Sequence, residues 1–201
     1  GYRGDRFDFA LIYRKVSSST SLDQGAYKDD DNYSLDFDRK LYSGQFKYRF
    51  NDRLSLDFCS GYTDTRRLAL NDSSIVPSTG LSDRTNSRED YSGKQLSGDL
   101  TLKVQGKNSL LTAGISGINE KMSQHSYVYS ALYAPFIYES ESNLDSIRPS
   151  FNSAAVFVHG DFSGKVISDN LEKFHLMGGF RLNHHSSYGF NRSFEISPSY
   201  R

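Results

Sequence analysis

The sequence predicts an all-β protein, an antiparallel transmembrane β-barrel of which about eight strands are visible. Three observations predict it: apolar residues alternate with polar ones, short and long connections alternate, and the composition is rich in aromatic residues. The 201 residues include 14 Tyr, 14 Phe and no Trp, while hydrophobic residues make up 36%. A soluble core would draw more on Leu, Ile and Val, whereas a barrel needs one apolar face per strand and aromatic girdles at the membrane interfaces.

The alternation of apolar residues locates each strand. In the first segment every second residue is large and apolar: Phe7, Phe9, Leu11 and Tyr13. The residues between them are small or polar, with the exception of Ile12. Period two indicates a strand rather than a helix. Each segment is about 8–12 residues long, close to the length that a tilted membrane strand needs and longer than a usual soluble strand. The same pattern predicts strands at 42–50, 54–62, 96–104, about 109–119, about 153–162, 174–183 and 194–200.

The polar phase of these strands carries charges in mid-strand. They are Lys47, Arg49, Asp57, Asp99, Lys103 and Arg181. In a barrel such residues line a wet lumen while the other face meets lipid. In a soluble β-sandwich they would face water over an apolar core, so this pattern alone fits both folds.

The connections favour the barrel. Short connections at 51–53, 105–108 and 164–172 alternate with long polar ones at about 17–40, 66–93 and 120–149. The connection at 184–191 should lie on the same side as the long ones, but it is short. Long structureless loops are uncommon in compact soluble domains. Short turns on one rim and long loops on the other are typical of outer-membrane barrels.

Charge and motif content exclude several classes of function. Lys plus Arg and Asp plus Glu are both 24, so the net charge is zero and no basic surplus points to nucleic acid. No apolar run reaches the length of a transmembrane helix, and no signal peptide opens the sequence, which indicates a removed signal or an internal fragment. No G-x-S-x-G element appears, and Cys59 has no activating base beside it in the sequence. We therefore expect no enzymatic activity.

The C-terminal part of the chain carries a recognisable hairpin pattern. Residues 172–189 read EKFHLMGGFRLNHHSSYG, and residues 196–201 read ISPSYR. The first run resembles the G-x-R-x-(D/N)-x-H-S-x-(F/Y)-G hairpin of TonB-dependent outer-membrane receptors. The second resembles, in slightly compressed form, the S-P strand that follows it, and residues 154–162, AAVFVHGDF, resemble the strand that precedes the hairpin.

The resemblance implies a barrel of roughly 22 strands that is plugged by an N-terminal globular domain. On this basis residues 1–201 are a partial β-barrel domain of a receptor, with the plug domain and the closing strands absent. The implied function is uptake of a scarce, bulky ligand, with cobalamin favoured over a siderophore or haem. The implied partners are outer-membrane lipid, the small-molecule ligand and the inner-membrane protein TonB, which would act through the absent plug.

Cobalamin is favoured because of an acidic loop. The run Asp29-Asp30-Asp31-Asn32-Tyr33 and the element around Asp64 resemble the calcium-holding elements of vitamin B12 receptors. Calcium takes several hard oxygen ligands, so the resemblance implies calcium at Asp29, Asp31 and Asp64; no other cofactor is expected. The alternative interpretation of the acidic run is a solvated loop. Haem ligation by His184 and His185 is less favoured than a plain role in the hairpin.

Two alternatives to the receptor remain open at this point. A barrel of eight strands can close on itself, which would give a self-contained structural or adhesin-like protein, or a small outer-membrane enzyme. A soluble β-sandwich that acts as a binding module is the other.

Overall fold

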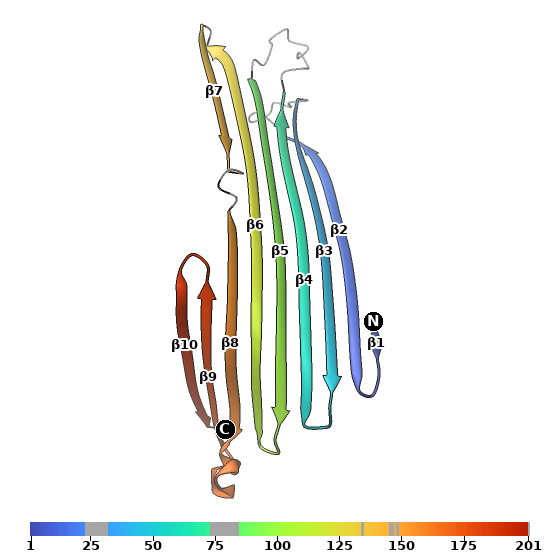
Figure 1. Ribbon diagram of the computed structural model, residues 1–201, viewed down its shortest axis with the longest axis vertical. Coiled ribbons are helices and arrows are strands. Elements are labelled where there is room, and N and C mark those ends of the chain that lie inside the picture. Colours follow the sequence, from blue (N-terminus) through green and yellow to red (C-terminus); the bar gives the residue numbers. More distant parts are fainter. Residues whose placement is uncertain (23–31, 73–84, 134, 145–146, 148, 201) are drawn as a thin grey trace.

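The computed structural model describes residues 1–22, 32–72, 85–133, 135–144, 147 and 149–200. Ten strands form one antiparallel sheet in this part of the chain (Figure 1). The strands are β1 (Tyr2–Arg3), β2 (Phe7–Ser21), β3 (Tyr33–Arg49), β4 (Leu54–Asn71), β5 (Thr85–Gln105), β6 (Ser109–Tyr133), β7 (Phe136–Asn143), β8 (Ser150–Ser163), β9 (Phe174–His185) and β10 (Gly189–Tyr200).

The sheet is a meander in which each strand pairs with its neighbours in the sequence. The order is β1-β2-β3-β4-β5-β6-β8-β9-β10, and β7 pairs with the far part of β6. The long strand β6 therefore has two partners on one side: its first half pairs with β8 and its second half with β7 (Figure 1). Strands β1 and β10 lie at the two edges of this order.

The predicted fold class is confirmed, and each of the eight predicted segments coincides with a strand, except that Phe50 lies one residue past the end of β3. The prediction of long loops is partly wrong, because β3, β4, β5 and β6 are 17, 18, 21 and 25 residues long. They include residues 33–40, 66–71, 85–93 and 120–133, which were predicted as parts of loops. Strands β1 and β7 were not predicted either, and the connection at 164–172 holds two short 3-10 helices, Gly164–Val166 and Asp169–Leu171. The reason is physical: where both faces of a sheet meet water, the hydrogen-bond ladder continues but the alternation of apolar residues stops.

The register places the alternating apolar residues of the long strands on one face. One row runs Phe9–Phe46–Phe58–Leu100–Ile115–Val156–Leu182 across seven strands. At one end of this face Tyr42 lies between Tyr13 and Tyr62, with ring centroids 4.9 and 6.2 Å apart. We call this face the apolar belt, and the opposite face of the same strands the polar face.

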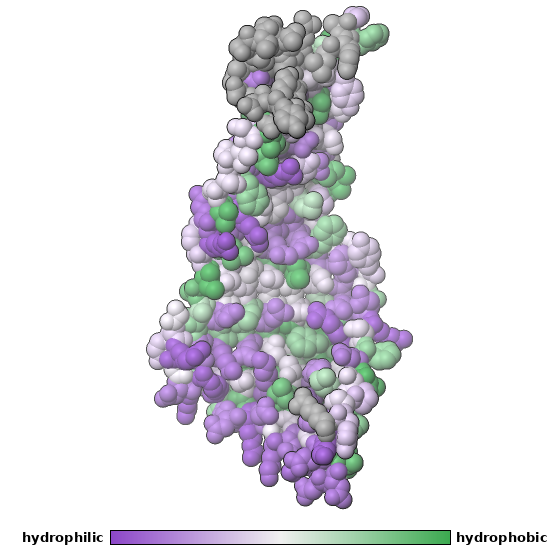
Figure 2. All heavy atoms as spheres, turned by 180° about the vertical axis from the view of Figure 1, so that it is seen from behind, coloured by the Kyte–Doolittle hydropathy of each residue, from purple (hydrophilic) through white to green (hydrophobic). Residues whose placement is uncertain are grey.

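No second layer covers the apolar belt in the described residues. Among all the described residues, the only buried hydrophobic side chains are Ala69 and Ala155. On the belt, Leu11, Phe194 and Ile196 are 75%, 81% and 73% exposed. A β-sandwich would bury such residues in a core, so that alternative does not fit. None of the described helices has the length and apolar character needed to cross a membrane. On the face seen in Figure 2, hydrophilic side chains dominate the lower part, where the short turns lie.

Candidate functional site

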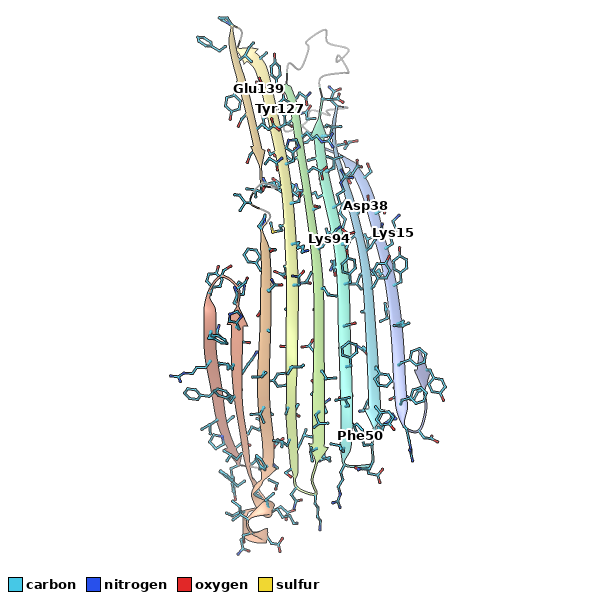
Figure 3. The ribbon with its side chains drawn as sticks, in the orientation of Figure 1. Lys15, Asp38, Phe50, Lys94, Tyr127 and Glu139 are labelled. Atoms are coloured by element: carbon cyan, nitrogen blue, oxygen red, sulfur yellow. The ribbon has the colours of Figure 1, made fainter. Side chains whose placement is uncertain are left out.

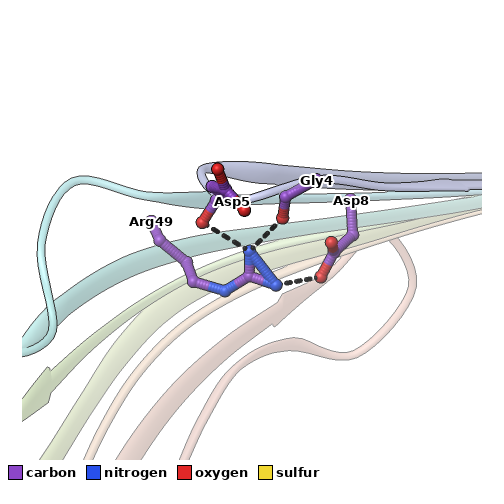
Figure 4. A network of polar contacts seen from close by, with 4 residues as sticks. All are labelled: Gly4, Asp5, Asp8 and Arg49. Carbon is purple, nitrogen blue, oxygen red and sulfur yellow. Dashed lines mark hydrogen bonds and ion pairs between the residues drawn. The ribbon is translucent and has the colours of Figure 1, made fainter.

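The polar face begins, beside the short turns, with an arginine of β3 that contacts β2 and the turn between β1 and β2. The Arg49 guanidinium donates through Nη1 to the carbonyl oxygens of Gly4 and Asp5, at 3.0 and 3.1 Å, and its Nη2 lies 2.5 Å from Oδ2 of Asp8 (Figure 4). The planar fork of arginine suits several acceptors at once. Arg49, at the end of β3, thus fixes the turn between β1 and β2.

Charges of alternating sign continue along this face. Lys103 Nζ lies 2.6 Å from Oδ2 of Asp57, and Lys47 is the cross-strand neighbour of Asp57 on the other side. These groups, together with Asp8, Gln45 and Cys59, line a hollow of about 730 Å³. The predicted placement of mid-strand charges on a single polar face is confirmed at Lys47, Arg49, Asp57 and Lys103.

Farther across the sheet the polar face carries an aromatic ring over a glycine. Phe157 of β8 is the cross-strand neighbour of both Gly114 of β6 and Arg181 of β9. The Arg181 guanidinium carbon lies 5.8 Å from the centre of the Phe157 ring, and its Nη2 donates to Oγ of Ser116 at 3.0 Å. A cation stacked on an aromatic ring and tied by hydrogen bonds is a rigid, polar contact surface.

The strand extensions beyond the apolar belt carry a second polar group. The Arg66 guanidinium donates to both carboxylate oxygens of Asp90, at 3.1 and 2.5 Å, and Arg88 lies 3.6 Å from the same carboxylate. The hydrogen bond from Arg66 lowers the pKa of Asp90, although partial burial opposes the shift. The same hydrogen bond raises the pKa of Arg66. Near the far end of β6, Tyr127 donates to Glu139 of β7 (Figure 3).

Of the predicted calcium ligands, only Asp64 is described by the structure. It lies in β4 directly between Lys40 and Lys94 in the register, and Asp29 and Asp31 lie outside the described residues. The described residues thus supply one carboxylate, against the six to eight oxygen ligands that calcium usually takes. Among them no three His, Cys, Asp or Glu side chains come together as a metal site. The calcium site stays a prediction.

The two adjacent histidines point to opposite faces of the sheet. His184 packs against Phe190 at 4.5 Å between ring centres, on the side of the apolar belt, whereas His185 stacks with Tyr188 at 4.7 Å. Successive residues of a strand alternate between faces, so these imidazoles do not form a joint ligand pair.

Sequence reasoning missed a row of lysines at the edge of the apolar belt. Lys15, Lys40 and Lys94 each lie two residues beyond the last apolar residue that their strand contributes to the belt face, namely Tyr13, Tyr42 and Leu96. In each strand, every second residue is apolar up to this point and the next residue on the same face is a lysine. That change from apolar to basic was the signal in the sequence that could have identified the row.

Comparisons with known proteins identify the fold as that of barrel receptors and transporters. The ferric preacinetobactin receptor BauA of Acinetobacter baumannii aligns over 98% of this chain and 35% of its own, with 13% identity and a TM-score of 0.54. The copper transporter OprC aligns over 97% of this chain and 31% of its own, with 12% identity and a TM-score of 0.62. The ferric citrate transporter FecA aligns over 96% of this chain and 30% of its own, with 13% identity and a TM-score of 0.52.

These likenesses show the fold. The chain spans about a third of the length of the structures that it matches. No protein-family model and no curated protein matches the sequence.

Proposed function

We propose that the chain is part of the barrel wall of a TonB-dependent outer-membrane receptor that imports a scarce, bulky ligand. The observation that carries this proposal is the division of one uncovered sheet into an apolar belt and a charged polar face. Such a sheet is stable when lipid covers the belt and water fills the space beside the polar face. The hairpin pattern at 172–189 and the likeness to barrel receptors and transporters support the same assignment.

The proposed parts of the mechanism follow from the two faces. Lipid surrounds the belt, and the polar face contacts the plug and the ligand path through groups such as Arg49, Lys103 and Arg181. Energy for import comes from TonB through the plug, which lies outside this chain. The barrel performs no covalent chemistry, and no nucleic acid takes part.

Two observations bear on the identity of the ligand, and they favour different candidates. The neighbouring structures are described as a receptor or transporters for ferric preacinetobactin, copper and ferric citrate, which supports a metal ion or metal chelate. The acidic run at 29–31 supports cobalamin instead, with calcium bound at Asp29, Asp31 and Asp64.

Uptake by cells that carry the full-length protein tests the receptor assignment. Radiolabelled ferric siderophores, copper and cobalamin would be supplied to a strain that lacks the gene, to the complemented strain and to a complemented strain without TonB. We expect one ligand to accumulate in the complemented strain only when TonB is present. Recovery of the protein outside the outer-membrane fraction, or equal uptake without TonB, would refute the assignment.

Calorimetric titration of the full-length protein in detergent separates the ligand candidates. If cobalamin is the ligand, cyanocobalamin should bind in calcium and bind more weakly after chelation. The double variant Asp29→Asn/Asp31→Asn should behave like the chelated protein, while Asp52→Asn, in the short turn between β3 and β4, should bind normally. Absence of binding under both conditions would reject cobalamin and leave the receptor assignment standing.

A further inference from the structure

Four lysines and one aspartate form a continuous row across five strands. The register joins Lys15 of β2, Lys40 of β3, Asp64 of β4, Lys94 of β5 and Lys121 of β6 as successive cross-strand neighbours. Side chains in such positions lie about 4.5–5.5 Å apart at their Cβ atoms. The four lysines are exposed, and the row carries a net charge of +3. We call it the lysine row.

The lysine row marks the edge of the apolar belt. Its members belong to the same face of the sheet as the belt and lie two residues beyond Tyr13, Tyr42, Tyr62, Leu96 and Asn119. In Figure 3, Lys15 and Lys94 lie at a similar level midway along the sheet, whereas Phe50 lies at the end with the short turns. Tyrosines and lysines at this place are typical of the membrane interface, where the ammonium group reaches the headgroups and the stem covers apolar surface.

The row has one carboxylate, that of Asp64, for four ammonium groups. Lys15 faces Lys40 directly, and Lys94 faces Lys121, an arrangement that is unfavourable in an antiparallel pair. None of the four lysines forms an ion pair within the described part of the chain.

Among the described residues, the nearest carboxylates beyond the row form no ion pair with its lysines. Asp38 accepts a hydrogen bond from Ser17 at 2.5 Å, and Asp90 is held by Arg66. Asp64 is one negative charge between two lysines. An anion from outside the chain would therefore relieve the repulsion between the paired lysines.

An apolar hollow lies on the belt close to Lys94 and Lys121. Gly98, Gly117 and Ala154 are successive cross-strand neighbours, and their missing or small side chains leave a hollow of about 650 Å³. Phe58, Ile115 and Val156 are among the residues that line it. Gly98 lies four residues from Lys94 along β5, which is about 13 Å. One elongated amphiphile could thus contact the cations with its head and the hollow with its tail.

We propose that the lysine row binds the phosphate groups of a lipid in the membrane leaflet on the side of the long connections, with an acyl chain in the hollow at Gly98, Gly117 and Ala154. Phosphate is the lipid group that combines negative charge with several acceptor oxygens, and basic side chains next to a membrane surface attract it. The inference rests on the membrane-spanning barrel proposed above but not on the identity of the imported ligand.

Lipid binding by the full-length protein tests the proposal. Purified protein in a neutral detergent would be titrated with diphosphoryl lipid A and, separately, with a dephosphorylated lipid A, and retained lipid would be counted by native mass spectrometry. The variant Lys94→Gln/Lys121→Gln should bind the phosphorylated lipid roughly 30-fold more weakly, which corresponds to about 1 kcal/mol for each lysine. The charge-conserving variant Lys94→Arg/Lys121→Arg should retain binding.

The matched control removes the same charge at the other end of the sheet. Lys107 and Lys173 are exposed beside the short turns, so Lys107→Gln/Lys173→Gln should bind lipid as the wild type does. Equal binding by the two Gln pairs, or equal binding of phosphorylated and dephosphorylated lipid, would overturn the proposal. Gel mobility before and after heating shows that each variant is folded. Failure of the protein to insert into membranes at all would instead refute the barrel assignment.

Discussion

Gly114 of β6 occupies a position where the sheet has no room for a side chain. An ideal Cβ at Gly114 would lie 2.6 Å from the carbonyl oxygen of Leu100 and 2.6 Å from Cζ of Phe157. Contacts below 3.0 Å are essentially never seen for real Cβ atoms, so something must move. The Leu100 oxygen belongs to the β5 backbone and cannot withdraw without disturbing the ladder between β5 and β6. We therefore predict that Gly114→Ala destabilises this part of the sheet.

The expected magnitude follows from which of the two contacts can relax. Overpacking of this kind costs about 1–3 kcal/mol, and a rigid backbone contact together with a ring held under Arg181 favours the upper part of that range. A local loss of about 2–3 kcal/mol corresponds to roughly 30- to 150-fold faster exchange of the backbone amides that open with this region.

Hydrogen–deuterium exchange of the full-length protein in detergent measures the effect locally, on peptides from β5 and β6. The control is Gly93→Ala, also on the polar face, where an added Cβ meets no atom within 4 Å. The double variant Gly114→Ala/Phe157→Ala should recover only part of the protection, because the Leu100 contact remains. Equal protection in Gly114→Ala and Gly93→Ala would refute the steric argument.

Three further predictions concern single contacts. Arg49→Gln should expose the turn between β1 and β2 to proteolysis and lower stability by about 1–2 kcal/mol, and an uncut turn would contradict this. Cys59 should react with a hydrophilic thiol reagent in membranes, whereas the variant Phe58→Cys/Cys59→Ser should react only with a lipid-soluble one; reversed labelling would invert the two faces. The pKa of Asp90 is lowered below its ordinary 3.8, so its pairing with Arg66 contributes stability above that value and the contribution is lost as the pH falls through the lowered pKa. Asp90→Asn should thus melt earlier than the wild type at pH 7, and the difference should shrink in strong acid; a difference that persists there would contradict the pairing.

The sequence by itself determined the fold class and the two faces of the strands. Alternation such as Phe7–Phe9–Leu11–Tyr13 requires a strand with one apolar side, since no other regular structure has period two. The same alternation assigned Lys47, Arg49, Asp57 and Lys103 to the polar face before any register was known. These properties depend on neighbours in sequence, so a single strand already contains them.

Only the tertiary structure decided where strands end and which charges meet. Beyond the apolar belt apolar and polar residues no longer alternate, so the pattern ends although β6 continues to Tyr133 and β7 pairs with it. The contact of Arg49 with Asp8 spans 41 residues of sequence, and the row from Lys15 to Lys121 spans five strands. Register sets these meetings, because a shift of one residue moves every side chain to the other face.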